Sequence, residues 1–485
     1  MATVATTVSP VILPSDRLEY TEAWGQAAGA LNYVYRPTTL EDLREIFALA
    51  RRTGRSVGLR GAGRSYGDAA YNAEGILIDF ARMNRILAWD PRQGIITMEP
   101  GVTIEQLWRY VLGDGWWPPV VPGTMTPTIG GVLGMNVHGK NNWKAGTTGD
   151  NVLKFTALLP TGEEVTCSRE ENRDLFYSII GGFGMLGVFT SITLKLKKVY
   201  SGELKVEAYT MPNIEAVVAD LDVQKDKHDY VVAWVDCFPR GKALGRSEVH
   251  VADYLKPGED PAPAQTLRLE HQDLPDTIMG FFPKSIVWMG MWFFLNNPGA
   301  WLTNTAKFMM AQFKGRHSYR QSYAAFNFLL DYVPNWKKAY LPGGLIQYQS
   351  FIPKDKAAAT YRKLIEITHK YGTPSYLAVM KRHRPDAFLM THALDGYSLA
   401  MDFKVTKGNR KKLVKMAAEM DAVVLAAGGR FYFAKDSTLH PESARAYLGE
   451  DTLATFVALK RRCDPDNLLQ TNLARRVLPE LFAGG

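Results

Sequence analysis

A glycine-rich stretch from Val57 to Asp79 restricts the fold of this chain more than any other part of the sequence. Within it, Gly61, Gly63 and Gly67 carry no Cβ atom, so the backbone can turn tightly and its N–H groups can line an anion-binding nest. The spacing G-A-G-R-S-Y-G differs from the G-x-G-x-x-G of nicotinamide-dinucleotide domains, and Ile76–Phe80 predicts a strand where those domains have a helix. We therefore predict a diphosphate site of another kind and disfavour a nicotinamide cofactor.

A second glycine-rich stretch runs from Val121 to Gly131 and ends in two adjacent glycines. It is followed by N-V-H-G-K-N at Asn136–Asn141 and by A-G-T-T-G-D-N-V at Ala145–Val152. A single glycine loop is as typical of a plain hairpin as of a ligand site, because lone motifs of this kind are weak. Two such loops in succession favour a cofactor site.

Seven motifs lie along the chain: R-G-A-G-R-S-Y-G-D (Arg60–Asp68), P-G-T (Pro122–Thr124), H-G-K-N (His138–Asn141), G-G-F-G-M-L-G (Gly181–Gly187), A-W-V-D (Ala233–Asp236), Q-Y-Q (Gln347–Gln349) and Y-F-A-K-D-S (Tyr432–Ser437). Together they resemble the FAD-linked oxidases of the vanillyl-alcohol oxidase/p-cresol methylhydroxylase (PCMH) type, over Tyr33 to Arg475, and the resemblance implies FAD as the cofactor. The last three motifs most resemble those of members that oxidise a polyprenyl-phosphate-linked ribose.

The fold that this resemblance implies is α+β, with a two-lobed PCMH-type FAD-binding domain and a substrate-binding cap domain built on an antiparallel sheet. We expect the FAD-binding domain at residues 1–200, the cap at 201–428, and a C-terminal segment at 429–485 that returns to the FAD-binding domain. The length of 485 residues agrees with more than one domain, because single cores stop growing at about 250 to 300 residues.

Composition excludes several classes of protein. Hydrophobic residues make up 46% and charged residues 22% of the chain, which is typical of globular proteins. The net charge is +8, but the basic residues form no stripe with interleaved aromatic residues, so we predict no nucleic-acid partner. The three cysteines are widely spaced and predict neither disulfides nor a zinc site. The first residues lack the pattern of a signal peptide, so we expect a cytoplasmic protein.

Local patterns predict individual helices and strands. Thr38 and Glu41 form a capping box and predict a helix over Leu40–Arg52, and a second helix is predicted from Thr103 to Leu112. The remaining predicted elements are strands at Ser56–Arg60, Ile76–Asp79, Ile95–Glu99, Thr190–Leu196, Tyr230–Asp236 and Ile346–Phe351, and a helix at Ala357–His369.

The resemblance places FAD against both glycine-rich stretches. Arg64 occupies the position where many of these oxidases carry the histidine that bonds covalently to the flavin. A guanidinium cannot form that bond, and neither loop contains histidine or cysteine, so we predict non-covalent FAD. The implied cofactor-binding residues are Arg60, Gly61, Ala62, Gly63, Arg64, Ser65, Tyr66, Gly67, Asp68, Ala69, Ala70, Gly123, Thr128, Ile129, Gly130, Gly131, His138, Gly139, Lys140, Asn141, Val188 and Tyr432.

Oxidation of a secondary alcohol needs a base that removes the hydroxyl proton. Lys435 matches the active-site lysine of the family, and its strand-like apolar frame at Phe431–Ala434 argues against a solvated surface lysine. Burial or nearby positive charges must lower its pKa before it can act as a base. His138 is the alternative base or proton relay, because imidazole titrates near neutrality. The sequence leaves this choice open.

A sugar pocket is also implied by the resemblance. Gln347 and Gln349 alternate onto one face of a strand, which fits a pocket lining. Phe183 and Ala400 depart from the family pattern, which has asparagine and a pocket cysteine at these positions, and they leave the exact sugar open. The implied substrate-binding residues are Tyr66, Trp234, Tyr340, Gln347, Gln349, Lys381 and Ala400, and no metal ligand is predicted.

An apolar segment at 278–316 is rich in Trp, Phe and Met. Two prolines and Lys284 interrupt it, so it falls short of a membrane-spanning helix. One interpretation is a buried part of the cap. The other is a surface that enters the bilayer boundary beside Lys307, Lys314 and Arg316, which would make the protein peripheral at the inner face of the plasma membrane.

The function that these features predict is FAD-dependent oxidation of a sugar hydroxyl, namely the 2-hydroxyl of a polyprenyl-phosphate-linked ribose. This would be the first half of an epimerisation to arabinose, completed by a separate NAD(P)H-dependent keto-reductase partner. Two alternatives stay open: an oxidase or dehydrogenase of free alditols or aldonolactones, and a non-catalytic flavin-binding subunit. The electron acceptor, oxygen or a quinone, is not defined by the sequence.

Overall fold

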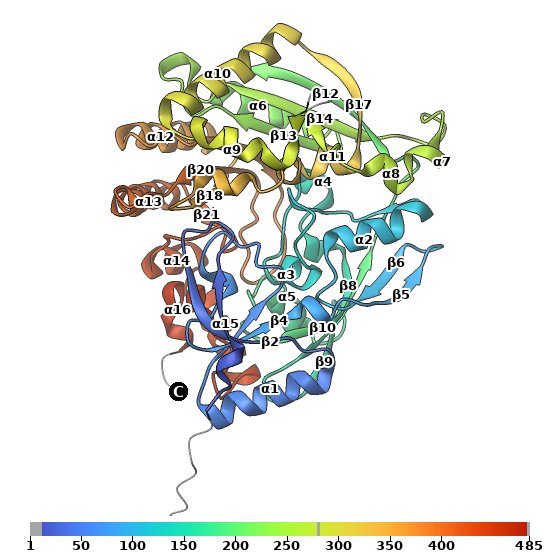
Figure 1. The fold of residues 1–485 in the computed structure, drawn as a ribbon, viewed down its shortest axis with the longest axis vertical. Helices are drawn as coiled ribbons and strands as arrows, with labels where there is room; N and C mark the ends of the chain where they lie inside the picture. The colour runs from blue at the N-terminus through green and yellow to red at the C-terminus, as the bar shows by residue number, and fades with distance from the viewer. Residues whose placement is uncertain (1–11, 279–281, 483–485) are drawn as a thin grey trace, which may run out of the picture.

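Residues 12–278 and 282–482 are described by the computed structural model of the protein. The chain forms two lobes, with both glycine-rich stretches in the first lobe and a large antiparallel sheet in the second (Figure 1). The first lobe has a four-stranded sheet and a five-stranded sheet, besides one short two-stranded pair. The order of the four strands is β1 (Leu18–Glu22), β2 (Gly29–Tyr35), β4 (Ile76–Asp79), β3 (Val57–Arg60). The order of the five strands is β5 (Ile86–Asp90), β6 (Ile95–Met98), β10 (Val188–Lys195), β8 (Val152–Leu158), β9 (Glu164–Ser168).

Helix α1 (Leu40–Thr53) packs its apolar face against the four-stranded sheet. The predicted capping box was displaced by one residue. Thr39, not Thr38, is the N-cap, and its side chain accepts a hydrogen bond from the backbone N–H of Asp42. The partner is Asp42 and not Glu41, because the Asp42 carboxylate accepts from the backbone N–H groups of both Thr38 and Thr39. The helix itself begins at the predicted residue.

Three further helices complete the packing of the first lobe: α2 (Ile104–Val111), α3 (Ile129–Gly134) and α5 (Arg173–Ile179). Helix α2 begins after Thr103 as predicted, because the Thr103 hydroxyl caps the backbone N–H of Gln106. The fully buried Trp108 of this helix packs against the fully buried Trp117, with ring centroids 5.8 Å apart. All four strands predicted in this lobe are present.

The second lobe is an eight-stranded sheet whose pairings are all antiparallel, as predicted for the cap. Helices α6 (Ile214–Gln224), α12 (Ala357–Lys370) and α13 (Arg410–Ala426) pack on one face of it. The strand order is β17 (His317–Ser322), β12 (Glu203–Met211), β14 (Ser247–Tyr254), β13 (Tyr230–Val235), β19 (Leu377–His383), β20 (Gly396–Lys404), β18 (Leu345–Pro353), β21 (Arg430–Phe431).

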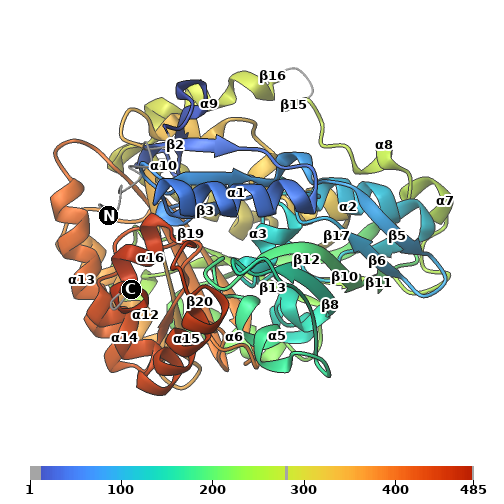
Figure 2. The same cartoon turned by 90° about the horizontal axis from the view of Figure 1, so that it is seen from below.

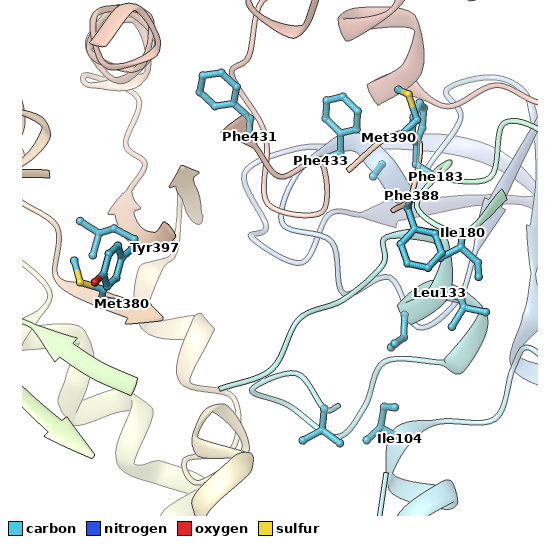
Figure 3. Packing of buried hydrophobic residues seen from close by; sticks show 14 of the residues in the cluster. Ile104, Leu133, Ile180, Phe183, Met380, Phe388, Met390, Tyr397, Phe431 and Phe433 are labelled. Atoms are coloured by element: carbon cyan, nitrogen blue, oxygen red, sulfur yellow. The ribbon is translucent and has the colours of Figure 1, made fainter. Parts of the chain in front are cut away.

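The C-terminal segment contacts both lobes. Its first strand, β21, pairs with β18 of the cap sheet, whereas helices α14 (Pro441–Leu448), α15 (Glu450–Cys463) and α16 (Asn472–Val477) lie beside the first lobe (Figures 1 and 2). The backbone N–H of Val57 on β3 donates to Leu468 at 2.7 Å. Between β21 and these helices, Phe433 packs against Phe183 of the first lobe at 5.2 Å between ring centroids (Figure 3).

Two further helices follow one another in the second lobe, α9 (Lys284–Phe294) and α10 (Asn297–Lys314), and α10 contacts β12 and β14 of the cap sheet. No helix of the described residues is long and apolar enough to cross a membrane. The remaining elements are short: β7 (Trp116–Trp117), β11 (Lys197–Lys198), β15 (Thr277–Ile278), β16 (Phe282–Pro283), α4 (Asn142–Ala145), α7 (Pro263–Thr266), α8 (Leu269–Gln272) and α11 (Tyr323–Asn327).

Candidate active site

A cavity of about 670 Å³ is lined by both glycine-rich stretches on one side and by the cap sheet on the other. The two stretches are in direct contact. A Cβ atom on Gly61 would lie only 2.0 Å from the hydroxyl of Thr128, and one on Gly130 would lie 2.7 Å from Pro100. Neither position has room for a side chain, because Gly61 lies against the second stretch and Gly130 lies against the segment that follows β6.

Most of the predicted cofactor-binding residues line this cavity. A Cβ atom on Gly134, which also lines it, would meet no atom within 4 Å, so open space lies beside the backbone of α3. At the other end of α3, Gly130 and Gly131 in its first turn also line the cavity. A dinucleotide fits such a cradle, because bare backbone and the N-terminal end of a helix favour phosphate groups. The lining members of the predicted set are Gly61, Ala62, Gly63, Arg64, Ser65, Tyr66, Ala69, Ala70, Gly123, Thr128, Gly130, Gly131, His138, Lys140, Val188 and Tyr432.

Six residues of the predicted set do not line the cavity. Arg60 donates to the backbone carbonyl of Ala70 at 2.9 Å and so closes the first loop. The Asp68 carboxylate forms an ion pair with Arg476 at 2.7 Å, which ties the same loop to α16. Arg60 and Asp68 therefore hold the loop in place and do not line the cavity. The other four are Gly67, Ile129, Gly139 and Asn141.

The opposite wall is formed by alternating residues of neighbouring strands in the cap sheet. On β20, Ala400 and Asp402 line the cavity, and they pair with Gln349 and Gln347 on β18. Lys381 on β19 lies in the adjacent row, opposite Ser398 of β20. Trp234 on β13 continues this wall. Of the predicted substrate-binding residues, only Tyr340 does not line the cavity; it is buried in a cluster with Tyr66.

Lys435 lies in a turn that follows β21, and not in the strand-like frame predicted from the sequence. The turn is closed by the backbone N–H of Lys435, which donates to Tyr432 at 3.0 Å. The Lys435 Nζ lies 3.8 Å from the centroid of the Tyr66 ring, inside the cavity. Burial lowers the pKa of Lys435 to about 7, opposed by Asp402 and reinforced by Lys381. An amine with this pKa can accept a proton near neutral pH.

His138 lies in a group of buried rings, with His383 at 4.8 Å and His392 at 5.5 Å between centroids. The side-chain amide nitrogen of Gln349 lies 3.0 Å from His138 Nε2. Burial, together with the charge of Lys381, holds the pKa of His138 well below its usual range. His138 is therefore neutral at physiological pH and is a weaker base than Lys435.

Several cavity residues were missed by the sequence analysis, and Asp402 is the most consequential. Its side chain is 1% exposed, and its Oδ1 accepts a hydrogen bond from Gln347 Nε2 at 2.5 Å. The signal was present, because residues two apart on a strand share a face and Ala400 had been placed in the pocket. His383 and His392 do not line the cavity but pack against His138, and the same signal applied to His383, which lies two residues after the predicted Lys381 on β19.

The apolar segment predicted at 278–316 is exposed rather than buried over most of α9 and α10, although residues 279–281 lie outside the described residues. Phe293 and Phe313 are 69% and 94% exposed. Lys307, predicted to lie beside lipid, instead lines the cavity and forms an ion pair with Glu248. We define the apolar helix surface by its exposed side chains: Ile286, Met289, Trp292, Phe293, Phe294, Trp301, Leu302, Met309, Met310 and Phe313.

Comparison with known proteins agrees with this geometry. Residues 31–168 match the family model described as a FAD binding domain. This part of the chain is therefore an FAD-binding domain, and the resemblance to FAD-linked oxidases of the PCMH type is confirmed, with FAD as the cofactor. The protein is an FAD-dependent oxidoreductase.

Individual relatives match different shares of the chain. The decaprenylphosphoryl-β-D-ribose oxidase of Mycolicibacterium smegmatis is 28% identical over 461 residues, which are 94% of this chain and 96% of that protein. The L-gulonolactone oxidase of Bos taurus is 28% identical over 209 residues, 43% of this chain and 46% of that protein. A putative D-arabinono-1,4-lactone oxidase of Neurospora crassa is 24% identical over 271 residues, 53% of this chain and 45% of that protein.

We expect acid precipitation of the purified protein to release the flavin into the supernatant. The reason is Arg64, whose guanidinium lies in the cavity 4.4 Å from the ring of Trp24 and cannot bond covalently to flavin. The absorbance of supernatant and pellet measures the outcome, with an enzyme carrying histidyl-linked FAD as the control. Yellow colour that stays with the pellet would contradict the prediction.

Proposed function

We propose that the protein oxidises a secondary hydroxyl of a sugar, namely the 2-hydroxyl of a polyprenyl-phosphate-linked ribose. The observation that carries this proposal is Lys435, a buried amine of lowered pKa that shares one cavity with the glycine loops and the polar cap wall. Bound FAD supplies the two-electron acceptor for the hydride of the alcohol carbon. Lys435 Nζ takes the hydroxyl proton, and the product is a ketone.

The polar wall supports a sugar as the substrate. Gln347 and Gln349 contribute amide groups, Lys381 contributes an amine, and Trp234 contributes an aromatic face. Amides donate and accept hydrogen bonds at once, and aromatic faces pack against the apolar face of a sugar ring, so this combination suits a polyol. His138 lines the same cavity beside Gln349 and adds no charge to it, because burial keeps its pKa low.

A lipid-linked substrate is supported by helix α10, which separates the cavity from the apolar helix surface. Asn304 and Lys307 on one side of α10 line the cavity, whereas Trp301 and Met310 are exposed on another. A sugar phosphate bound in the cavity could therefore place its polyprenyl chain along an apolar face of the same molecule. The relative from Mycolicibacterium smegmatis is named for a substrate of this kind.

The ketone product calls for a second enzyme. Oxidation makes the reacting carbon a planar carbonyl carbon without a configuration. A separate NAD(P)H-dependent keto-reductase could then reduce the ketone to the alcohol of opposite configuration. The pair would convert the ribose unit to arabinose. This partner is part of the proposal and follows from the chemistry of the product.

We expect a polyprenyl-phosphoryl ribose to bleach the bound flavin under anaerobic conditions faster than any free alditol or aldonolactone. Stopped-flow absorbance of the flavin measures the rates across this panel of substrates. Faster bleaching by a free alditol or aldonolactone would replace the lipid-linked substrate by a soluble one. Absence of bleaching by every member of the panel would mean that the protein binds flavin without turnover.

We expect the double variant Phe293→Ser, Phe313→Ser to bind liposomes more weakly than the wild type, with an unchanged flavin spectrum. Both side chains are exposed on the apolar helix surface, so their replacement removes lipid contacts without opening the core. Sedimentation with liposomes measures the binding. Leu31→Ser is the matched control, because Leu31 is 49% exposed on β2 of the other lobe. Equal binding by the double variant and the control would exclude this surface as the membrane contact.

A further inference from the structure

Asp402 is a buried carboxylate in the cavity wall for which the catalytic step above provides no role. Its Oδ1 accepts a hydrogen bond from Gln347 Nε2 at 2.5 Å. Its Oδ2 is buried as well, and within the described residues it has no hydrogen-bond partner. A buried carboxylate oxygen without a donor costs free energy, so such an atom is expected to meet its donor in another state of the protein.

The surroundings of Asp402 raise the pKa of its carboxyl to about 6, so the ionised form still predominates at neutral pH, and they leave space beside it. Burial raises the pKa of the Asp402 carboxyl, whereas the hydrogen bond from Gln347 and the charge of Lys435 oppose this shift. No hydrogen bond or ion pair joins Asp402 directly to Lys435 in the part of the chain that the structure describes. Ala400, two residues earlier on the same face of β20, contributes only a methyl group. A gap therefore lies next to the acceptor.

We propose that Asp402 Oδ2 accepts a hydrogen bond from a second hydroxyl of the sugar, one that is not oxidised. Asp402 is then a specificity-determining residue that selects polyols over simple alcohols. This inference rests on the proposed function, because it assumes that a sugar occupies the cavity. The donor must be a hydroxyl of the ligand, since an ionised carboxylate only accepts hydrogen bonds.

A purely structural role for Asp402 makes a different prediction. If the carboxylate only positions Gln347 or holds Lys435 by its charge, its replacement affects every substrate by the same factor. If Oδ2 binds one particular hydroxyl, the effect disappears for the one analogue that lacks this hydroxyl. The substitution Asp402→Asn separates these cases, because asparagine keeps the acceptor at Oδ1 for Gln347 and replaces Oδ2 by a donor.

The probes are methyl β-D-riboside and its 3-deoxy and 5-deoxy analogues. Anaerobic stopped-flow measurement of flavin reduction against probe concentration gives a dissociation constant and a limiting rate for each. The matched control is Asp421→Asn, because Asp421 on α13 is also buried, accepts a hydrogen bond from Tyr348, and has an unpaired Oδ2, but does not line the cavity.

We expect Asp402→Asn to weaken binding of methyl β-D-riboside by about ten- to hundredfold, the range for losing a hydrogen bond to a charged group. One deoxy analogue should bind the wild type more weakly by a similar factor and show little further loss with Asp402→Asn. Asp421→Asn should leave all three dissociation constants unchanged. An equal loss for all three probes with Asp402→Asn would overturn the proposal.

Stability provides a second measurement. We expect Asp402→Asn to keep FAD and its melting temperature, because a buried charge with an unpaired oxygen is not needed by the fold. Loss of FAD or a lower melting temperature would overturn the proposal, since the carboxylate would then be structural. If neither the probes nor polyprenyl-phosphoryl ribose perturbs or reduces the flavin of the wild type, the proposed function fails instead, and the two failures are thus distinguishable.

Discussion

Replacing Lys435 by alanine will lower the rate of substrate-driven flavin reduction by about two to four orders of magnitude, the usual contribution of a general base. FAD will remain bound, because the glycine loops supply most of its predicted cradle and the substitution removes only the Lys435 side chain. Anaerobic stopped-flow absorbance measures the rate, and the flavin spectrum measures binding. Primary amines added to Lys435→Ala should restore part of the rate, since they can enter the vacated space and accept the proton.

The pH dependence of the wild type is linked to the same residue. Burial lowers the pKa of Lys435 to about 7, so its unprotonated form predominates above that pH. The rate should rise as pH increases through about 7 and then stay constant. Lys435→Ala should lose this rise. A wild-type rate in Lys435→Ala would transfer the role of base to His138, whose pKa is far lower.

Replacing Gly67 by alanine will lower the free energy of unfolding by about 1–3 kcal/mol, the range that is typical of overpacking. A Cβ atom at this position would lie 1.9 Å from the backbone carbonyl oxygen of Asp436. Backbone cannot rotate away as a side chain can, so the turn that carries Lys435 must move. The melting temperature of the FAD-bound protein measures the loss, and flavin reduction should fall with it.

The control for this substitution is Gly113→Ala. A Cβ atom on Gly113 would meet no atom within 4 Å, so the same chemical change should leave the melting temperature almost unaltered. Equal behaviour of the two variants would show that the contact between Gly67 and Asp436 does not constrain the turn.

Local patterns were sufficient to predict much of the fold. The strand at Ile76–Asp79 and the helix that begins at Leu40 were found because alternation and helical spacing are properties of a few neighbouring residues. The capping box was displaced because both Thr38 and Thr39 can act as caps. The turn of Lys435 was mistaken for a strand, since strand β21 ends at Phe431 and the buried residues after it are covered by packing, such as that of Phe433 on Phe183, and not by strand pairing.

The site was harder to predict than the fold, because its residues are distant in the sequence. Asp402 meets Gln347 only through the pairing of β20 with β18, and no local pattern defines that register. The exposure of Phe313 was equally undetermined, since a run of apolar residues is compatible with a core and with a surface. Tyr340 was assigned to the pocket by resemblance, yet it does not line the cavity and is buried against Tyr66, which does.

The ion pair between Asp68 and Arg476 joins residues that are 408 positions apart. Val57 on β3 likewise completes its backbone hydrogen bonds with Leu468 and Gln470. During synthesis on the ribosome, the first glycine loop emerges long before these partners exist. The first glycine loop of the nascent FAD-binding lobe therefore lacks these contacts until residues 468–476 have been translated.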